Sequence, residues 1–168
     1  GLYPVKSDKF LIWGKVSEND SKNNDFIEPT KLKIIGHPGY DSWKSTSIHK
    51  DSSYVLLALT GPEHMLIQGH QVSNIIKFEN HLEEICKIVT AMKKKLIIKI
   101  HPAPQLFNFS EMIKKISSEI EVISAGSIME LINSCDVMIT TNYTTAILES
   151  YLLQKPVICL PIIDYNLG

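Results

Sequence analysis

Short runs of aliphatic and β-branched residues alternate along this chain with stretches of helical periodicity, and this alternation constrains the fold most. Several runs are apolar at every position, as expected for parallel strands that are buried on both faces. Between the third and fourth runs, residues 72–92 carry apolar side chains at three- and four-residue steps, which predicts a long helix. The candidate strands are residues 10–13, 32–35, 54–59, 96–100, 121–123, 137–140 and 156–160.

Strand–helix–strand alternation with short connections favours right-handed crossovers and an open parallel sheet with helices on both sides. We therefore expect an α/β fold, a Rossmann-like doubly wound parallel sheet of about six or seven strands in one domain. Shorter helices are predicted at 110–118, 127–134 and 144–153. Ser127 and Thr144 are the expected N-caps, and Glu130 stands at capping-box spacing from Ser127. The polar segment 18–30 predicts a loop or a frayed helix.

The composition excludes several classes of protein. With 168 residues, 44% of them hydrophobic, the chain is long enough for one domain with a core of its own. A formal net charge of −1 argues against nucleic acid as the main partner, and no apolar run is long enough to cross a bilayer. The widely spaced Cys86, Cys135 and Cys159 are typical of reduced thiols in a cytoplasmic protein. Neither a metal site nor an organic cofactor is expected.

All seventeen basic residues are lysines. Without arginine the chain lacks the planar fork that binds phosphate through two parallel hydrogen bonds. Any phosphate must therefore be held by lysine, by hydroxyl groups, by backbone N–H groups or by a helix end. A coding bias of the source is the simpler explanation of this composition, but the consequence for a binding site is the same.

In open parallel sheets, ligands bind beyond the carboxyl ends of the strands. Residues 140–145 are the richest such segment, because they run from a predicted strand into a helix start and carry mostly hydroxyl and amide side chains. These groups and the N–H groups of the first helical turn can hold a phosphate, although Thr144 can also be a plain N-cap. Glu149 stands one helical turn further along, where its carboxylate would accept hydrogen bonds from ribose, or it is simply an exposed helix residue.

His101 follows the predicted strand 96–100 and precedes Pro102, which favours an extended backbone at the edge of the sheet. Its imidazole would point into the crevice and donate to a phosphate or sugar oxygen, although a lone histidine is more often structural. Lys99 lies inside the same strand, where burial is costly unless the amine pairs with an anion or reaches the sheet edge. Gly61 follows another strand end and allows close approach of the backbone.

Several of these segments resemble a known group of enzymes. Lys99-Ile-His-Pro102 looks like the strand-end His-Pro of CDP-glycerol glycerophosphotransferase-like and capsule-type transferases. The segment from Asp136 to Thr145, with Glu149 and Lys155-Pro-Val-Ile158, resembles their donor-binding segment. Gly36-His-Pro-Gly-Tyr-Asp41 is similar to the stretch that opens the C-terminal domain of GT-B enzymes and of non-hydrolysing UDP-GlcNAc 2-epimerases. Together these pieces span residues 9–160.

The resemblance implies that residues 1–168 form the C-terminal, donor-binding half of a GT-B transferase of surface polysaccharide biosynthesis. It implies a nucleotide-activated sugar or polyol as donor, and an N-terminal acceptor domain that this chain lacks. Residues 1–30 would be the entry segment between the two, and the 168 residues alone would be inactive. Membrane contact would come only through the acceptor. The implied donor-binding residues are Gly61, His101, Gly126, Ser127, Asn142, Tyr143, Thr144, Thr145 and Glu149, with His101 also stabilising the leaving group.

Two departures keep other functions open. The 2-epimerases have Ser-Gly-Gly where this chain has residues 142–145, which contain no glycine. The glycerophosphotransferases have Asp-Tyr-Ser-Ser there, whereas Asn142 replaces the acidic residue here. Half of a 2-epimerase and a non-enzymatic nucleotide- or phosphate-binding module are therefore the alternatives. The sequence identifies neither the nucleobase, the sugar or polyol, the acceptor nor the catalytic base.

Overall fold

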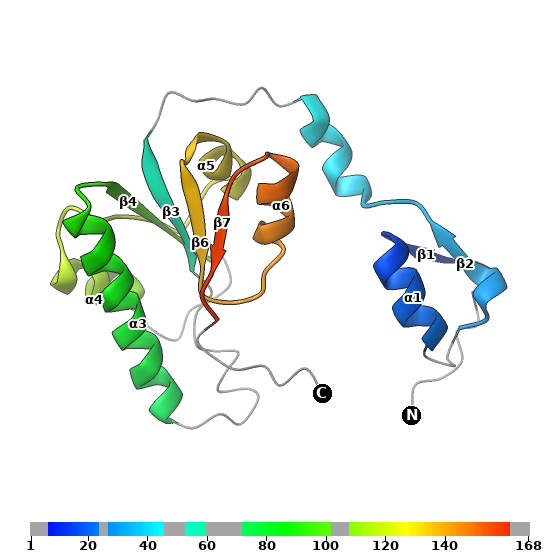
Figure 1. Cartoon of the computed structure of the whole chain (residues 1–168), viewed down its shortest axis with the longest axis horizontal. Coiled ribbons are helices and arrows are strands. Elements are labelled where there is room, and N and C mark those ends of the chain that lie inside the picture. The colour runs from blue at the N-terminus through cyan, green and yellow to red at the C-terminus, as the bar shows by residue number, and fades with distance from the viewer. Residues whose placement is uncertain (1–6, 24–26, 46–52, 60–71, 102–107, 162–168) are drawn as a thin grey trace. The chain divides into compact units, whose positions relative to one another are not determined.

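The computed structural model describes residues 7–23, 27–45, 53–59, 72–101 and 108–161, and all of their side chains except those of 42–45 and 72–75. Contacts divide the chain into two compact units, Gly1–Thr46 and Ser47–Gly168. The larger unit contains the main sheet (Figure 1).

Five parallel strands form this sheet in the order β5-β4-β3-β6-β7 (Figure 1). Their bounds are Tyr54–Leu59 (β3), Lys95–Ile100 (β4), Glu121–Ile123 (β5), Val137–Thr140 (β6) and Val157–Cys159 (β7). The central strand β3 is buried at every position, which explains its continuously apolar sequence. The α/β, Rossmann-like class predicted from the sequence is thereby confirmed.

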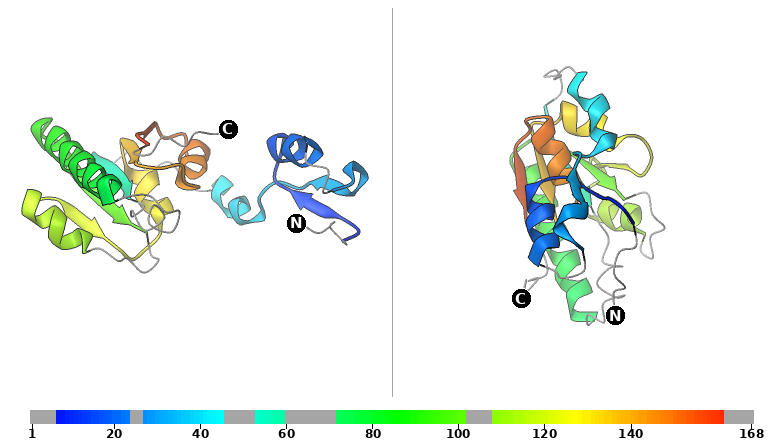
Figure 2. Two further views of the ribbon diagram at one scale, coloured as in Figure 1. Left: turned by 90° about the horizontal axis from the view of Figure 1, so that it is seen from below. Right: turned by 90° about the vertical axis from the view of Figure 1, so that its right-hand side faces the viewer.

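Among the described residues, four helices cover this sheet, two on each face (Figures 1 and 2). They are α3 (Val72–Ala91) and α4 (Phe109–Ile116) on one face, and α5 (Ile128–Ser134) and α6 (Ala146–Leu152) on the other. The chain winds outward from β3 through β4 to β5, then returns to β6 beside β3 and continues to β7. The direction of winding therefore reverses between β3 and β6, and this reversal is where doubly wound sheets bind ligands. In the described ranges, no helix combines the length and apolar character that crossing a bilayer requires.

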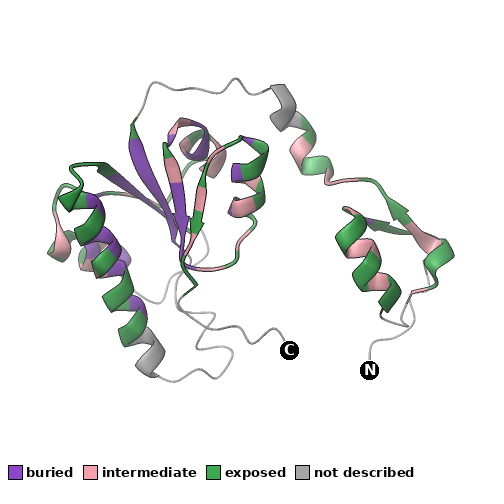
Figure 3. Ribbon diagram, in the orientation of Figure 1, coloured by how far each residue is buried: buried purple, intermediate pink, exposed green. Residues whose placement is uncertain are grey.

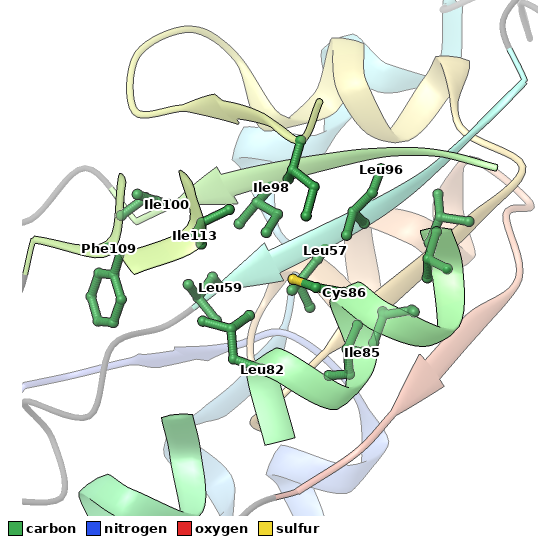
Figure 4. Packing of buried hydrophobic residues seen from close by; sticks show 14 of the residues in the cluster. Leu57, Leu59, Leu82, Ile85, Cys86, Leu96, Ile98, Ile100, Phe109 and Ile113 are labelled. Carbon is green, nitrogen blue, oxygen red and sulfur yellow. The ribbon is translucent and has the colours of Figure 1, made fainter. Parts of the chain in front are cut away.

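The core lies between α3, α4 and the inner strands. Figure 3 shows one buried stripe along α3, and Figure 4 shows the residues that this stripe packs against. Leu82 and Cys86 on α3, Leu57 on β3 and Ile98 on β4 each have 0% of their surface exposed. The apolar residues that recur every three or four positions along α3 are therefore the ones that pack against the sheet.

Two helices of the larger unit, α3 and α6, are followed by a residue with a left-handed backbone that is not glycine. After α3, Lys93 has φ 55°, its N–H donates to the Thr90 carbonyl at 2.9 Å, and the Lys94 N–H donates to the Val89 carbonyl at 3.3 Å. Gln154 ends α6 in the same way, also with φ 55°. This pair of bonds is the Schellman motif, which usually has glycine at the left-handed position.

The smaller unit is a β–α–β arrangement with two short 3₁₀ helices. Its elements are β1 (Phe10–Ile12), α1 (Lys15–Asn23), η1 (Pro29–Lys31), β2 (Leu32–Ile34) and η2 (Pro38–Ser45). The strands β1 and β2 pair in parallel as a separate sheet, so the seven strands among the described residues divide between two sheets. The start of the segment 18–30 is helical, because α1 extends to Asn23 and a Lys22–Glu18 ion pair of 2.8 Å joins successive turns.

The three thiols differ in their surroundings, and this predicts their reactivity. Cys86 and Cys135 are buried, and burial raises the pKa of each thiol to about 11, whereas Cys159 is only half-buried. A raised pKa leaves less thiolate, the reactive form, at about pH 8. An aromatic disulfide reagent should therefore label Cys159 rapidly, and Cys86 and Cys135 only when the protein opens.

The Cys159→Ser variant should lose the rapid phase, and denaturant should release all three wild-type thiols. Rapid labelling of Cys86 in the native protein would contradict this assignment of burial.

Candidate active site

A cavity of about 250 Å³ lies at the carboxyl ends of the central strands. It adjoins the reversal between β3 and β6, because its lining comes from the ends of β3 and β4, the β5–α5 loop and the start of α6. The lining residues are Ala58, Leu59, Lys99, Ile100, His101, Gly126, Ile128, Thr144, Thr145, Ala146 and Glu149. An apolar base with a few convergent polar groups is typical of small-molecule sites.

The pairing of β3 with β4 places His101 at the rim of this cavity. Leu59 pairs with Ile100, the last residue of β4, and the next N–H, that of His101, donates to the Leu59 carbonyl at 3.1 Å. His101 is therefore tied to the sheet by its backbone while its side chain is exposed. Such a side chain is accessible to a ligand in the cavity.

The turn between β6 and α6 supplies two threonines. The N-cap of α6 is Thr145 rather than the expected Thr144, and the Thr145 side chain makes no capping hydrogen bond. The Thr144 hydroxyl instead accepts the Ala146 N–H at 3.4 Å, two residues ahead. Thr145 itself has helical backbone angles, φ −59° and ψ −24°, so the hydroxyl that satisfies an N–H of the first turn is that of Thr144. Glu149 follows one turn later, half-buried, and lines the same cavity.

The loop from β5 to α5 brings Gly126 to the cavity. Gly126 has φ +85°, a left-handed conformation in which a side chain would be strained, so glycine is required here by the backbone. Ser127 is the N-cap of α5 as expected, but its side chain makes no capping hydrogen bond, so the predicted capping box with Glu130 is not formed.

Lys99 is the charged residue of the cavity lining that the predicted set of binding residues does not include. Lys99 is only 5% exposed. Its Nζ donates to the Ser124 carbonyl at 2.7 Å and to the Ile100 carbonyl at 3.3 Å. Burial lowers the pKa of this amine from its ordinary value. The sequence signal was a single lysine inside an otherwise apolar strand, which marks either a strand edge or a functional amine.

The structure brings five of the nine predicted binding residues into the lining. They are His101, Gly126, Thr144, Thr145 and Glu149. Ser127, Asn142 and Tyr143 lie on the adjoining turns outside the lining, and Gly61 lies outside the described residues. The Asn142 side-chain oxygen accepts the Tyr143 N–H at 2.8 Å, so this amide shapes the β6–α6 turn.

Two further hydroxyls lie at the end of β6. Thr140 and Thr141 are buried, and their side-chain oxygens have no hydrogen-bond partner in the part of the chain that the structure describes. No group of three or more histidine, cysteine or acidic side chains that could hold a metal ion occurs among the described residues.

Comparison with known proteins gives one family. The sequence model of a family described as "LIC12162 family transferase" matches residues 5–165, nearly the whole chain. The matched range includes every strand of the main sheet and every described residue that lines the cavity. Among proteins with curated descriptions, none matches this chain.

Proposed function

Because this chain belongs to the LIC12162 family of transferases, we propose that the cavity binds the activated donor of a group-transfer reaction. The proposed donor is a nucleotide-sugar or a nucleotide-diphospho-alcohol. One observation carries the proposal: a buried amine, an imidazole, two hydroxyls and a carboxylate line one cavity beside the reversal of the sheet. That position is the usual ligand site of doubly wound sheets.

Each group has a proposed partner on the donor. His101 and the hydroxyls of Thr144 and Thr145 donate to the diphosphate, and the Glu149 carboxylate accepts from the ribose hydroxyls. The nucleobase lies near residues 125–127, where Gly126 keeps the loop free of a side chain. The donors are uncharged or positive and the single acceptor is negative, as a nucleotide with an anionic diphosphate and a neutral ribose requires.

In the proposed reaction, an acceptor hydroxyl attacks the donor at its transferable group. With a nucleotide-sugar, the bond from the anomeric carbon to the nucleoside diphosphate breaks, and the diphosphate takes the electron pair. With a nucleotide-diphospho-alcohol, the bond between the two phosphates breaks, and the nucleoside monophosphate takes the electron pair. In both cases negative charge grows on the phosphate oxygens of the leaving nucleotide, and preorganised donors aimed at that charge lower the barrier. The base that takes the acceptor proton is proposed to come from an acceptor domain, following the GT-B resemblance. The same resemblance to capsule-type transferases supports surface polysaccharide synthesis as the setting.

Calorimetry with a panel of nucleoside diphosphates and nucleotide-sugars tests this proposal. At least one compound should bind the wild-type chain, and His101→Ala and Glu149→Gln should each weaken that binding by about 1–2 kcal/mol, the scale of hydrogen bonds involving a charged group. Melting temperatures should stay nearly unchanged, because His101 is exposed and Glu149 only half-buried.

Matched controls are available on α3, where His81 and Glu84 are exposed and outside the cavity lining. The changes His81→Ala and Glu84→Gln should leave nucleotide affinity alone. Intact binding by the site variants, together with lowered melting temperatures, would mean that His101 and Glu149 are structural.

A further inference from the structure

Lys99 stands out among the lining residues because it combines a cationic group with deep burial. It is 5% exposed, and it is the only lysine among the described residues that line the cavity. The chain contains no arginine, so lysine is the only strongly basic side chain that it can use. Burying an ammonium group is costly unless the protein or a ligand compensates the charge.

The described residues compensate that charge only in part. Two of the three ammonium hydrogens can be accounted for by the Ser124 and Ile100 carbonyls, at 2.7 and 3.3 Å. No carboxylate among the described residues forms an ion pair with Lys99, although lysines elsewhere do so, as Lys95 does with Glu121 at 2.8 Å. The ammonium group thus keeps one donor and most of its charge for another partner.

The two carbonyls also fix where the amine lies. Ser124 begins the loop that carries Gly126 to the cavity, and Ile100 is the end of β4, so the amine is anchored where these two segments meet. The two carbonyl contacts already restrict the Lys99 side chain, so it loses less conformational entropy when a ligand binds. Lys99 is therefore already positioned for an anion in the cavity.

We infer that Lys99 binds the phosphate-bearing part of the ligand directly and provides the positive charge by which this cavity selects a diphosphate. This inference rests on the proposed function for the identity of the ligand, but the anion site itself is independent of the nucleoside. The other titratable groups among the described lining residues are His101 and Glu149. Glu149 repels an anion, so the phosphate lies on the Lys99 and His101 side and the carboxylate faces the uncharged part of the donor.

Inorganic pyrophosphate is the probe, because it carries the anion without the base or sugar. In calorimetry, Lys99→Met should bind pyrophosphate at least about tenfold more weakly than the wild-type chain, which corresponds to about 1.4 kcal/mol. Lys95→Met is the matched control, since Lys95 belongs to the same strand but is exposed. Retained affinity in folded Lys99→Met would overturn the inference.

Nuclear magnetic resonance of the lysine ammonium groups gives a second readout that does not depend on a variant folding. Pyrophosphate should shift the Lys99 signal of the wild-type chain and leave that of Lys95 in place; the Lys99→Arg spectrum identifies the signal. An unmoved Lys99 signal at saturating pyrophosphate, or no pyrophosphate binding, would overturn the inference. If pyrophosphate shifts Lys99 but no compound of the nucleotide panel binds, the proposed donor class fails and the Lys99 assignment stands.

Discussion

The double variant Thr144→Val/Thr145→Val is expected to bind its best nucleoside diphosphate about 5–150-fold more weakly than the wild-type chain, a loss of about 1–3 kcal/mol. Valine keeps the shape of threonine and removes only the hydroxyl. Both hydroxyls belong to residues that line the cavity, and an anionic phosphate forms stronger hydrogen bonds than a neutral acceptor. Isothermal calorimetry of both proteins with the same ligand measures the difference.

Thr90→Val provides the control, because Thr90 is exposed on α3 and does not line the cavity. The double variant also loses the bond from the Ala146 N–H to the Thr144 hydroxyl, which at 3.4 Å is long and contributes little. Melting temperature should therefore change only slightly. Unchanged affinity in the folded double variant would leave these threonines with a purely local role at the start of α6.

Leu57→Ala should lower the free energy of unfolding by about 2–5 kcal/mol, the largest effect expected of any single change described here. Leu57 is completely buried in the central strand and packs in the cluster with Leu82, Cys86 and Ile98 (Figure 4). Close-packed neighbours relax only partly around a shortened side chain, so the change leaves a cavity as well as removing apolar contacts.

The measurement should follow the secondary structure of the larger unit by circular dichroism in denaturant. Trp13 and Trp43 are the two tryptophans of the chain, and both lie in Gly1–Thr46, so tryptophan fluorescence reports the smaller unit. Leu152→Ala is the matched control, since Leu152 is 54% exposed on α6. Equal effects of the two substitutions would show that burial at Leu57 does not determine stability.

The inner strands of the main sheet could be predicted closely because β3, β4 and β6 are buried at most positions. The bounds expected for β3 and β6 agree with those observed, since an apolar run that ends at polar residues defines a buried strand well. The bounds of β5 also agree, although its residues are exposed or half-buried. The hydrophobic pattern could not show that residues 10–13 and 32–35 lie outside the main sheet. Strand pairing depends on contacts between distant segments, and β1 and β2 pair with each other instead.

Helix ends were harder to predict than strands for a local reason. Ser127 and Glu130 have the residue types and the spacing of a capping box, but the Ser127 side chain makes no capping hydrogen bond. Lys93 and Gln154 adopt left-handed backbones although neither is glycine, so no residue type marked these helix ends. Backbone hydrogen bonds and packing decide these positions, and a single sequence does not display them.

The candidate site was predictable where it follows from strand ends. His101, Thr144 and Thr145 line one cavity because parallel strands bring their carboxyl ends to the same edge. Lys99 was harder to assign, because alternation along a strand does not tell whether an amine reaches solvent or stays inside. Its contacts with the Ser124 and Ile100 carbonyls settle that question, and they depend on the β4–β5 pairing.

The reversal of winding beside β3 also has a consequence for the order of folding. The strands β3, β4 and β5 are consecutive in the chain, as are β6 and β7, so each group can assemble through comparatively local contacts. Joining the two groups pairs Val55 with Val137, which are far apart in the sequence. Because closing a long stretch of chain costs entropy, we expect this step to be the slow one. The cavity adjoins that seam, so it is complete only after closure. A bound donor would therefore delay the parting of β3 from β6 and slow unfolding, while leaving the rate of folding almost unchanged.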